Sequence, residues 1–290
     1  MNTIRCKSEN YYTRMDRAKV YIDYTNNRMK IVSIENISPQ NIRRLVHFAS
    51  KRHLDKIICN CNVKSYENFL KAGFKLEGII NGFFKGKDAF YMSFFISNSR
   101  QVSTNSAKEN LILKKSLSMQ NTFVSKPYNL KYTIRQANEN DIKDIVKLFS
   151  YVFSTYPSPI FDEKYLKRIM NKNVLYKVAV YNNKIISICS ANLDKENLNA
   201  KISDCATYPS YRGKGIMSNI IYSLESDLKD MGYMTLYSLS RAICPSINFI
   251  FSKHNYKFKG KLINNCNICG GFEDMNLWVK NINSHLPLNS

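Results

Sequence analysis

The segment CATYPSYRGKGIMS, from Cys205 to Ser218, carries the strongest signal in this chain of 290 residues. Its first residues are typical of a strand, Gly213 and Gly215 indicate a turn, and an amphipathic helix follows. The first N–H groups of a helix have no partner within the helix and carry the positive end of its dipole. Glycine has no Cβ, so an anion can approach its backbone closely. The segment therefore predicts a pyrophosphate-binding turn, because one phosphate satisfies several of these donors together.

The helix after this turn has one apolar side, which we expect to pack on a sheet, and Gly232 ends it. The residues at helical spacing are Met217, Ile220, Ile221, Leu224 and Leu228. A glycine pair alone also fits an ordinary strand-to-helix connection with a basic tip. The elements around the turn decide between these readings.

Periodicity and breakers predict a mixed α/β domain around the turn. Asn182 and Asn183 are typical of a two-residue hairpin loop between two of the strands. The expected strands are 131–136, 174–181, 184–192, 200–207, 234–239, 256–262 and 272–280, and the other expected helices are 141–153, 162–170 and 246–254.

Residues 131–280 resemble the GNAT superfamily of N-acetyltransferases, whose signature is Arg or Gln, two residues, Gly, one residue, then Gly or Ala. Here it reads RGKGIM from Arg212, so Met217 departs from the pattern at the last position. The resemblance implies a mostly antiparallel sheet flanked by helices, with acetyl-CoA as co-substrate. It assigns acetyl-CoA binding to the following residues: Ala206, Thr207, Tyr208, Arg212, Gly213, Lys214, Gly215, Ile216, Met217 and Ser218.

Several short blocks look more specifically like the beta-lysine N-acetyltransferase family. They are DCAT at 204–207, YRGKG at 211–215, SRA at 240–242, NN at 264–265 and EDMN at 273–276. This resemblance implies acetylation of N6 of beta-lysine, a small amino acid, to make a compatible solute. The alternatives are another amine, such as a polyamine, an aminoglycoside or a protein lysine, and a non-catalytic acetyl-CoA sensor.

The implied chemistry is direct attack of a neutral amine on the thioester. A lysine-type amine has a pKa of about 10.4, so keeping it neutral at pH 7 costs about 4.6 kcal/mol without help from the protein. A carboxylate beside the amine can accept its proton. We expect Asp204 to be this base and Glu273 to be second, although either carboxylate fits a solvated surface position as well. Residues 206–208 are expected to donate a backbone N–H to the reacting oxygen. Phe251 stands where relatives place a tyrosine acid.

The same blocks suggest residues that bind an amino-acid substrate. Arg241 is the expected partner of the carboxylate, because a guanidinium makes a two-pronged contact, although contact with CoA phosphate or solvent fits equally well. Asn264 and Asn265 are expected to add hydrogen bonds. Tyr156, in a proline-bearing loop, is expected to cover the aliphatic stem.

The N-terminal part repeats the C-terminal part. The pattern FxKxxFKLxGxI at 69–80 returns as FxKxxYKFxGxL at 251–262, an offset of 182 residues. Residues 31–39 stand where the glycine turn would be, but they contain Glu35 and no glycine. We therefore expect a degenerate acetyltransferase-like domain over 1–96, a linker over 97–129 and the catalytic domain over 130–290.

The net charge of +21 first suggests nucleic acid, but the lysines are scattered and no basic run or RNA-binding signature is present. We expect no specific nucleic-acid partner and no membrane association. Eight cysteines without a signal peptide favour free thiols in a reducing cytoplasm. Cys266 and Cys269 lack a nearby histidine at zinc-finger spacing, so no metal is expected. The sequence leaves a homodimer open.

Overall fold

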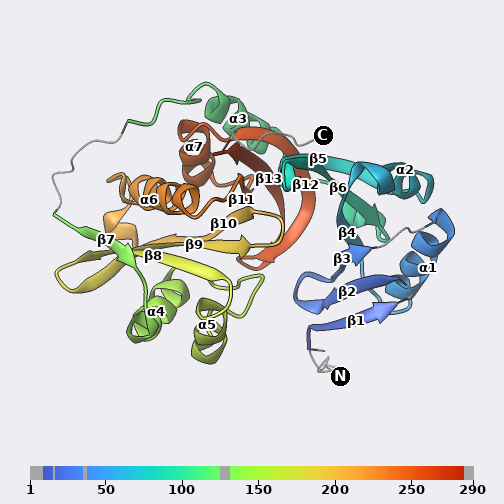
Figure 1. The fold of residues 1–290 in the computed structure, drawn as a ribbon, viewed down its shortest axis with the longest axis horizontal. Helices are drawn as coiled ribbons and strands as arrows, with labels where there is room; N and C mark the ends of the chain where they lie inside the picture. Colours follow the sequence, from blue (N-terminus) through green and yellow to red (C-terminus); the bar gives the residue numbers. More distant parts are fainter. Residues whose placement is uncertain (1–8, 16, 35–37, 125–130, 284–290) are drawn as a thin grey trace.

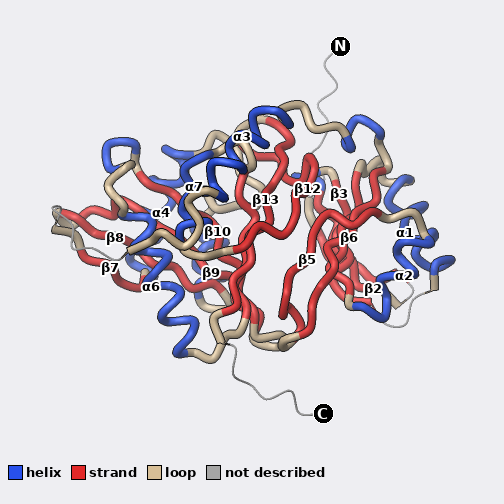
Figure 2. The backbone as a smooth tube through the Cα atoms, turned by 90° about the horizontal axis from the view of Figure 1, so that it is seen from above, coloured by secondary structure: helices blue, strands red, loops and turns tan. Residues whose placement is uncertain are grey.

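The computed structural model describes residues 9–15, 17–34, 38–124 and 131–283. It is a mixed α/β fold, as expected, in which one sheet of thirteen strands runs through the whole molecule (Figures 1 and 2). The strand order is β1-β2-β3-β4-β6-β5-β12-β13-β11-β10-β9-β8-β7. None of the helices in the described ranges has the length and apolarity needed to span a lipid bilayer.

Within its described residues, the N-terminal half supplies six strands and two α-helices. In chain order they are β1 (Tyr11–Met15), β2 (Ala18–Asp23), β3 (Arg28–Ile34), α1 (Pro39–Ser50), β4 (Lys56–Cys61), α2 (Val63–Lys71), β5 (Lys75–Phe84) and β6 (Lys87–Phe95). Ser38 caps α1 and Asn62 caps α2, each by accepting a backbone N–H of the first turn. The segment 35–37, which includes Glu35, lies outside the described residues.

The rest of the chain begins with α3 (Ser106–Leu117), which packs against α7 in Figure 1. The elements that follow are β7 (Thr133–Gln136), α4 (Ile142–Val152), α5 (Glu163–Met170), β8 (Val174–Tyr181), β9 (Lys184–Asp194), β10 (Asn199–Thr207), α6 (Ile216–Asp230), β11 (Thr235–Arg241), α7 (Pro245–Lys253), β12 (Lys257–Ile268) and β13 (Gly271–Asn281). In Figure 1, α6 and α7 cover one face of this part of the sheet, and α4 and α5 cover the other.

The two halves share one strand order. The order of neighbouring strands in the first half is β1-β2-β3-β4-β6-β5. The corresponding order in the second half is β8-β9-β10-β11-β13-β12. The pairs β3–β4 and β10–β11 are parallel. Helices α2 and α7 both begin and end 182 residues apart, the offset of the sequence repeat. This correspondence supports the proposal that the first half descends from the same fold as the second.

The halves join at two glycines that the repeat makes equivalent, Gly78 in β5 and Gly260 in β12. A Cβ at Gly260 would lie 2.1 Å from the carbonyl oxygen of Glu77 and 2.5 Å from the Cα of Gly78. Gly260 also has a φ of +151°. The two backbones therefore approach too closely for any side chain at this position.

One face of the N-terminal half packs on α1 and α2, and the other turns toward the second half. Ala18, Val20, Met29 and Ile31 form the core under the helices. On the other face, Ile58 and Tyr91 pack against residues of β12 and β13, which are Leu262, Cys266 and Met275.

Lys56 and Arg28 of the first half, together with Arg100 of the segment that follows it, hold a bulge in β12. The register of β12 shifts between Leu262 and Cys266, so the strand expected over 256–262 continues past this irregularity to Ile268. Three successive carbonyl oxygens accept hydrogen bonds here: Ile263 from Lys56 (2.8 Å), Asn264 from Arg100 (2.7 Å) and Asn265 from Arg28 (2.6 Å). Arg100 lies in the expected linker and is buried, so the start of that segment belongs to the packed interface.

Gly260→Ala is predicted to lower the free energy of unfolding by at least about 3 kcal/mol, because the new methyl group must push two backbones apart. Urea denaturation measures this. Gly271→Ala is the matched control, since a Cβ there meets no atom within 4 Å; we expect a change within about 0.5 kcal/mol. A Gly260→Ala protein as stable as the wild type would contradict the close approach.

Candidate active site

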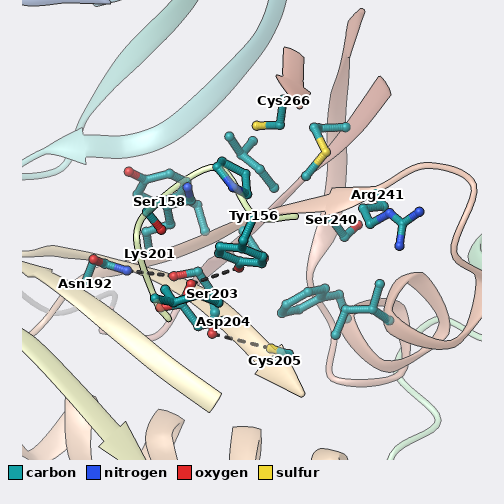
Figure 3. A pocket seen from close by; sticks show the side chains of 18 of the residues that line it. Tyr156, Ser158, Asn192, Lys201, Ser203, Asp204, Cys205, Ser240, Arg241 and Cys266 are labelled. Carbon is teal, nitrogen blue, oxygen red and sulfur yellow. Dashed lines mark hydrogen bonds between the residues drawn. The ribbon is translucent and has the colours of Figure 1, made fainter. Parts of the chain in front are cut away.

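The strands β10 and β11 separate part-way along their length. Their parallel pairing ends at Lys201 and Tyr237, yet β10 continues to Thr207 and β11 to Arg241. A cavity of about 1490 Å³ is lined by residues on both sides of this gap. Gly215 and Phe251 line it from the side of α6 and α7, and Tyr156 lines it from the α4–α5 loop (Figure 3). Two reactants approaching from opposite faces of the sheet can therefore meet in the gap.

The glycine turn presents an open helix start to this cavity. Gly213 (φ 76°) and Gly215 (φ 73°) both adopt the left-handed conformation that favours glycine. Gly215 caps α6 without a side-chain hydrogen bond, and the first turn holds no acidic residue. A Cβ at Gly213 would meet nothing within 4 Å. The turn therefore has the free donors, the space and the charge that a pyrophosphate requires.

The residues expected at the turn do not all face the cavity. Those that line it are Thr207, Arg212, Gly213, Gly215, Ile216, Met217 and Ser218. Arg212 Nε also donates to the Thr207 carbonyl (3.1 Å), which ties the turn to the end of β10. Lys214 lies instead over the ring of Tyr211, 5.3 Å from its centroid. Ala206 and Tyr208 pack with the core that α4 and α5 cover.

Asp204 lies at a β-bulge in β10, with a φ of +50° and only 9% of its surface exposed. Its Oδ1 accepts a hydrogen bond from Tyr156 (2.9 Å), and its Oδ2 accepts from Ser190 (2.7 Å) and Tyr176 (3.1 Å). Burial, and then the Asp204 charge, raise the pKa of both tyrosines well above the usual value, so they stay protonated donors.

These hydroxyl groups orient the Asp204 carboxylate without neutralising it. No salt bridge within the described ranges includes this residue. A largely buried anion that has no ion-pair partner attracts a cationic ligand, because the pair offsets the cost of desolvation. The arrangement suits the recruitment of an ammonium group to the gap.

The backbone near the end of β10 has one amide directed toward the gap. The N–H of Tyr208 donates to Ile186 of β9 (3.1 Å). Alternate residues of an antiparallel strand direct their N–H groups to opposite sides. Ala206 therefore faces β9 as Tyr208 does, and Thr207 directs its N–H away from β9, toward β11.

Arg241 and Glu273 bind each other. The Nε and Nη2 of Arg241 donate to the two carboxylate oxygens of Glu273, and this hydrogen bonding raises the pKa of Arg241. Arg241 lines the cavity and Glu273 does not. The two-pronged face of the guanidinium is thus already occupied by a carboxylate of the protein itself.

Asn264 and Asn265 lie in the bulge of β12, between the two halves, and neither lines the cavity. The side chain of Asn264 donates to the carbonyls of Arg100 (3.2 Å) and Val102 (2.8 Å). Asn265 Oδ1 accepts from Tyr91 (3.2 Å). The structure therefore brings together Asp204, Tyr156 and the glycine turn, but places both asparagines in the interface.

Phe251 lines the cavity beside the turn, with its ring buried and packed edge-to-face on Tyr256. It has no proton to give to a leaving group. Cys205, next to Asp204, contacts Cys189 with their sulfurs 3.0 Å apart. Within the described ranges, no cluster of three or more His, Cys, Asp or Glu residues could hold a metal ion.

Comparison with known proteins agrees with this geometry. The Acetyltransferase (GNAT) domain family matches residues 133–244. A beta-lysine N(6)-acetyltransferase of Methanosarcina mazei is 36% identical over 80% of this chain and 93% of its own. The chain belongs to the GNAT acetyltransferase family. It is an acyltransferase, as the resemblance to the GNAT superfamily implied.

One further relative and one solved structure extend the comparison. A beta-lysine N(6)-acetyltransferase of Methanococcus maripaludis is 31% identical over 90% of this chain and 95% of its own. Among solved structures, the ribosomal-protein-S18-alanine N-acetyltransferase of Escherichia coli is 16% identical, covers 55% of this chain and 99% of its own, and has a TM-score of 0.49.

Several residues of this site were not predicted from the sequence. Tyr176 and Ser190 reach Asp204 from β8 and β9, and Lys30 and Lys201 line the cavity from β3 and β10. None of them belongs to a motif. The alternation of β9 and β10 was a usable signal for Ser190 and Lys201, because it assigns side chains to a face once the strands are paired.

Arg212→Gln is predicted to raise KM for acetyl-CoA about tenfold, with kcat changed less than about twofold, because it removes one charge-assisted contact at the turn. Steady-state kinetics with varied acetyl-CoA measures this. Arg44→Gln is the control, since Arg44 is an exposed residue of α1, the helix that takes the place of α6 in the first half. Equal effects of the two substitutions would exclude a specific role of Arg212.

Proposed function

We propose that this acetyltransferase transfers the acetyl group of acetyl-CoA to N6 of beta-lysine. The observation that carries the proposal is the similarity to two beta-lysine N(6)-acetyltransferases over 80% and 90% of this chain. That similarity extends well beyond residues 133–244, so it includes part of the first half of the chain.

The pyrophosphate of acetyl-CoA would be held by the backbone of the glycine turn, with Arg212 adding a charge-assisted contact. The co-substrate supplies an acetyl group activated as a thioester. Of the residues expected to assist the reacting oxygen, Thr207 is the best candidate, because its N–H is directed toward the gap. Phe251 offers no acid, and a thiolate with a pKa near 8.5 leaves without one.

Asp204 would recruit the ammonium group of the acceptor and accept its proton, directly or through water. We propose Asp204 rather than Glu273 as the base, because both oxygens of Glu273 accept hydrogen bonds from Arg241. The ring of Tyr156, whose hydroxyl holds Asp204, would lie along the aliphatic stem of the substrate.

Asp204→Asn is predicted to lower kcat at least about a hundredfold, within the range of general base catalysis, and to shift the pH profile of kcat/KM to more alkaline values. The shift follows because a larger fraction of the amine must lose its proton in solution before it binds. The control is Asp230→Asn, at the exposed end of α6. A wild-type pH profile for Asp204→Asn would remove Asp204 as the base.

The substrate is tested by thiol release from acetyl-CoA with beta-lysine, alpha-lysine, ornithine, spermidine and a lysine peptide, and by mass spectrometry of the products. We expect the highest kcat/KM for beta-lysine and acetylation at N6. A higher kcat/KM for another amine would identify that amine as the substrate and leave the proposed chemistry unchanged. Binding of acetyl-CoA without turnover on any amine would indicate a sensor.

A further inference from the structure

The first half contributes a wall of the cavity. Tyr21, Asp23, Arg28 and Lys30 of β2 and β3 line it, facing the α4–α5 loop and the start of β10. These residues belong to the face of β2 and β3 that α1 and α2 leave uncovered. The acceptor side of the active site is therefore built from both halves of the chain.

The cations at this wall differ in whether they have an ion-pair partner. Arg28 binds Asp23 (3.0 Å) and the carbonyl of Asn265, and the nearby Lys56 binds Glu77 (2.7 Å). Lys30 and Lys201 also point charges toward this part of the cavity, but the described residues offer neither of them an ion pair or a side-chain hydrogen bond. Figure 3 shows Lys201 among Ser158, Asn192 and Ser203.

Both lysines line the cavity, where Lys30 is exposed and Lys201 is half-buried. The protein around the cavity desolvates Lys30, and this effect, followed by the charges of Lys201 and Arg28, lowers the pKa of Lys30 to about 8 although its side chain is open to the cavity. Burial also lowers the pKa of Lys201, against the opposing charge of Asp204. The anions close to these lysines are Asp23 and Asp204, and Asp23 already binds Arg28 while three hydroxyl groups hold Asp204. This part of the cavity thus holds three cations and two anions, so it carries one uncompensated positive charge.

We propose that Lys30 of the first half and Lys201 of the second form a subsite that binds the carboxylate of the amino-acid acceptor. This inference rests on the proposed function and specifies its substrate class: an amine that carries a carboxylate at its other end. A carboxylate between the two ammonium groups satisfies donors from both lysines and removes their mutual repulsion.

The position of the subsite relative to Asp204 supports this assignment. Lys201 and Asp204 are three residues apart on β10, so their Cα atoms are separated by about 10 Å at the usual strand rise. The bulge between Ser203 and Ala206 brings the Asp204 side chain to Ser190 and Ser203, on the face that Lys201 shares, and the spacing leaves room for an extended chain of several carbons. The ammonium group that reacts would lie at Asp204 and the gap, and the carboxylate would lie at Lys30 and Lys201.

The test compares beta-lysine with its carboxamide, beta-lysinamide, which keeps both amines and loses the negative charge. We expect Lys30→Met and Lys201→Met each to raise KM for beta-lysine about tenfold or more, as the loss of a charge-assisted contact predicts, and to leave KM for the amide within about twofold. Lys30→Arg is expected to retain most of the wild-type KM, because it keeps the charge. Lys64→Met, on the exposed side of α2, controls for the loss of one lysine.

Stability provides a second readout. Lys30 has no partner to leave unpaired, so Lys30→Met is expected to melt at or above the wild-type temperature while it loses affinity. Equal losses for beta-lysine and the amide, or no loss for either, would overturn the subsite and leave the acetyltransferase proposal intact.

Wild-type protein that acetylates neither compound would instead overturn the proposed function. Calorimetric titration with beta-lysine then tests the subsite independently of turnover. Binding that is lost with the amide and with Lys30→Met supports it, and binding that is unchanged by both, or absent from the wild type, contradicts it.

Discussion

The close approach of two backbones at Gly78 and Gly260 is the constraint on which this structure depends. With no side chain between them, β5 and β12 pair, and two half-sheets with one strand order become a single sheet. Because the junction lies on β12, the uncovered face of the first half turns toward the gap between β10 and β11. A half without a glycine turn thereby becomes a wall of the acceptor site.

The charges along this cavity are opposite in sign to the charges of the two reactants. The turn before α6 offers unpaired N–H groups to an anion, and Asp204 offers a negative charge to an ammonium group. Lys30 and Lys201 offer positive charge farther from the gap. Hydroxyl groups hold Asp204 without neutralising it, and the described residues give Lys30 and Lys201 no ion pair, so all three charges remain available to a ligand of opposite charge.

The sequence predicted those features that depend on local pattern. The glycine turn, the amphipathic α6, the hairpin at Asn182 and the offset of 182 residues are all visible in short windows, and the structure contains the corresponding elements. The pairing of charged side chains could not be predicted in the same way. Arg241 and Glu273 are neighbours only because β11 pairs with β13, and Lys30 meets Lys201 only because the halves join at β5 and β12. Asn264 and Asn265 resembled substrate ligands because their block is distinctive, but Arg100 and Arg28 bind the carbonyl groups of that block, which serves the packing of the two halves.

The most direct measurement of this account is a crystal structure of the protein with CoA and beta-lysine. The account predicts the pyrophosphate at the start of α6, the N6 amine within hydrogen-bond distance of Asp204, and the carboxylate between the ammonium groups of Lys30 and Lys201. A carboxylate bound at Arg241, or a substrate that makes no contact with the first half, would contradict it.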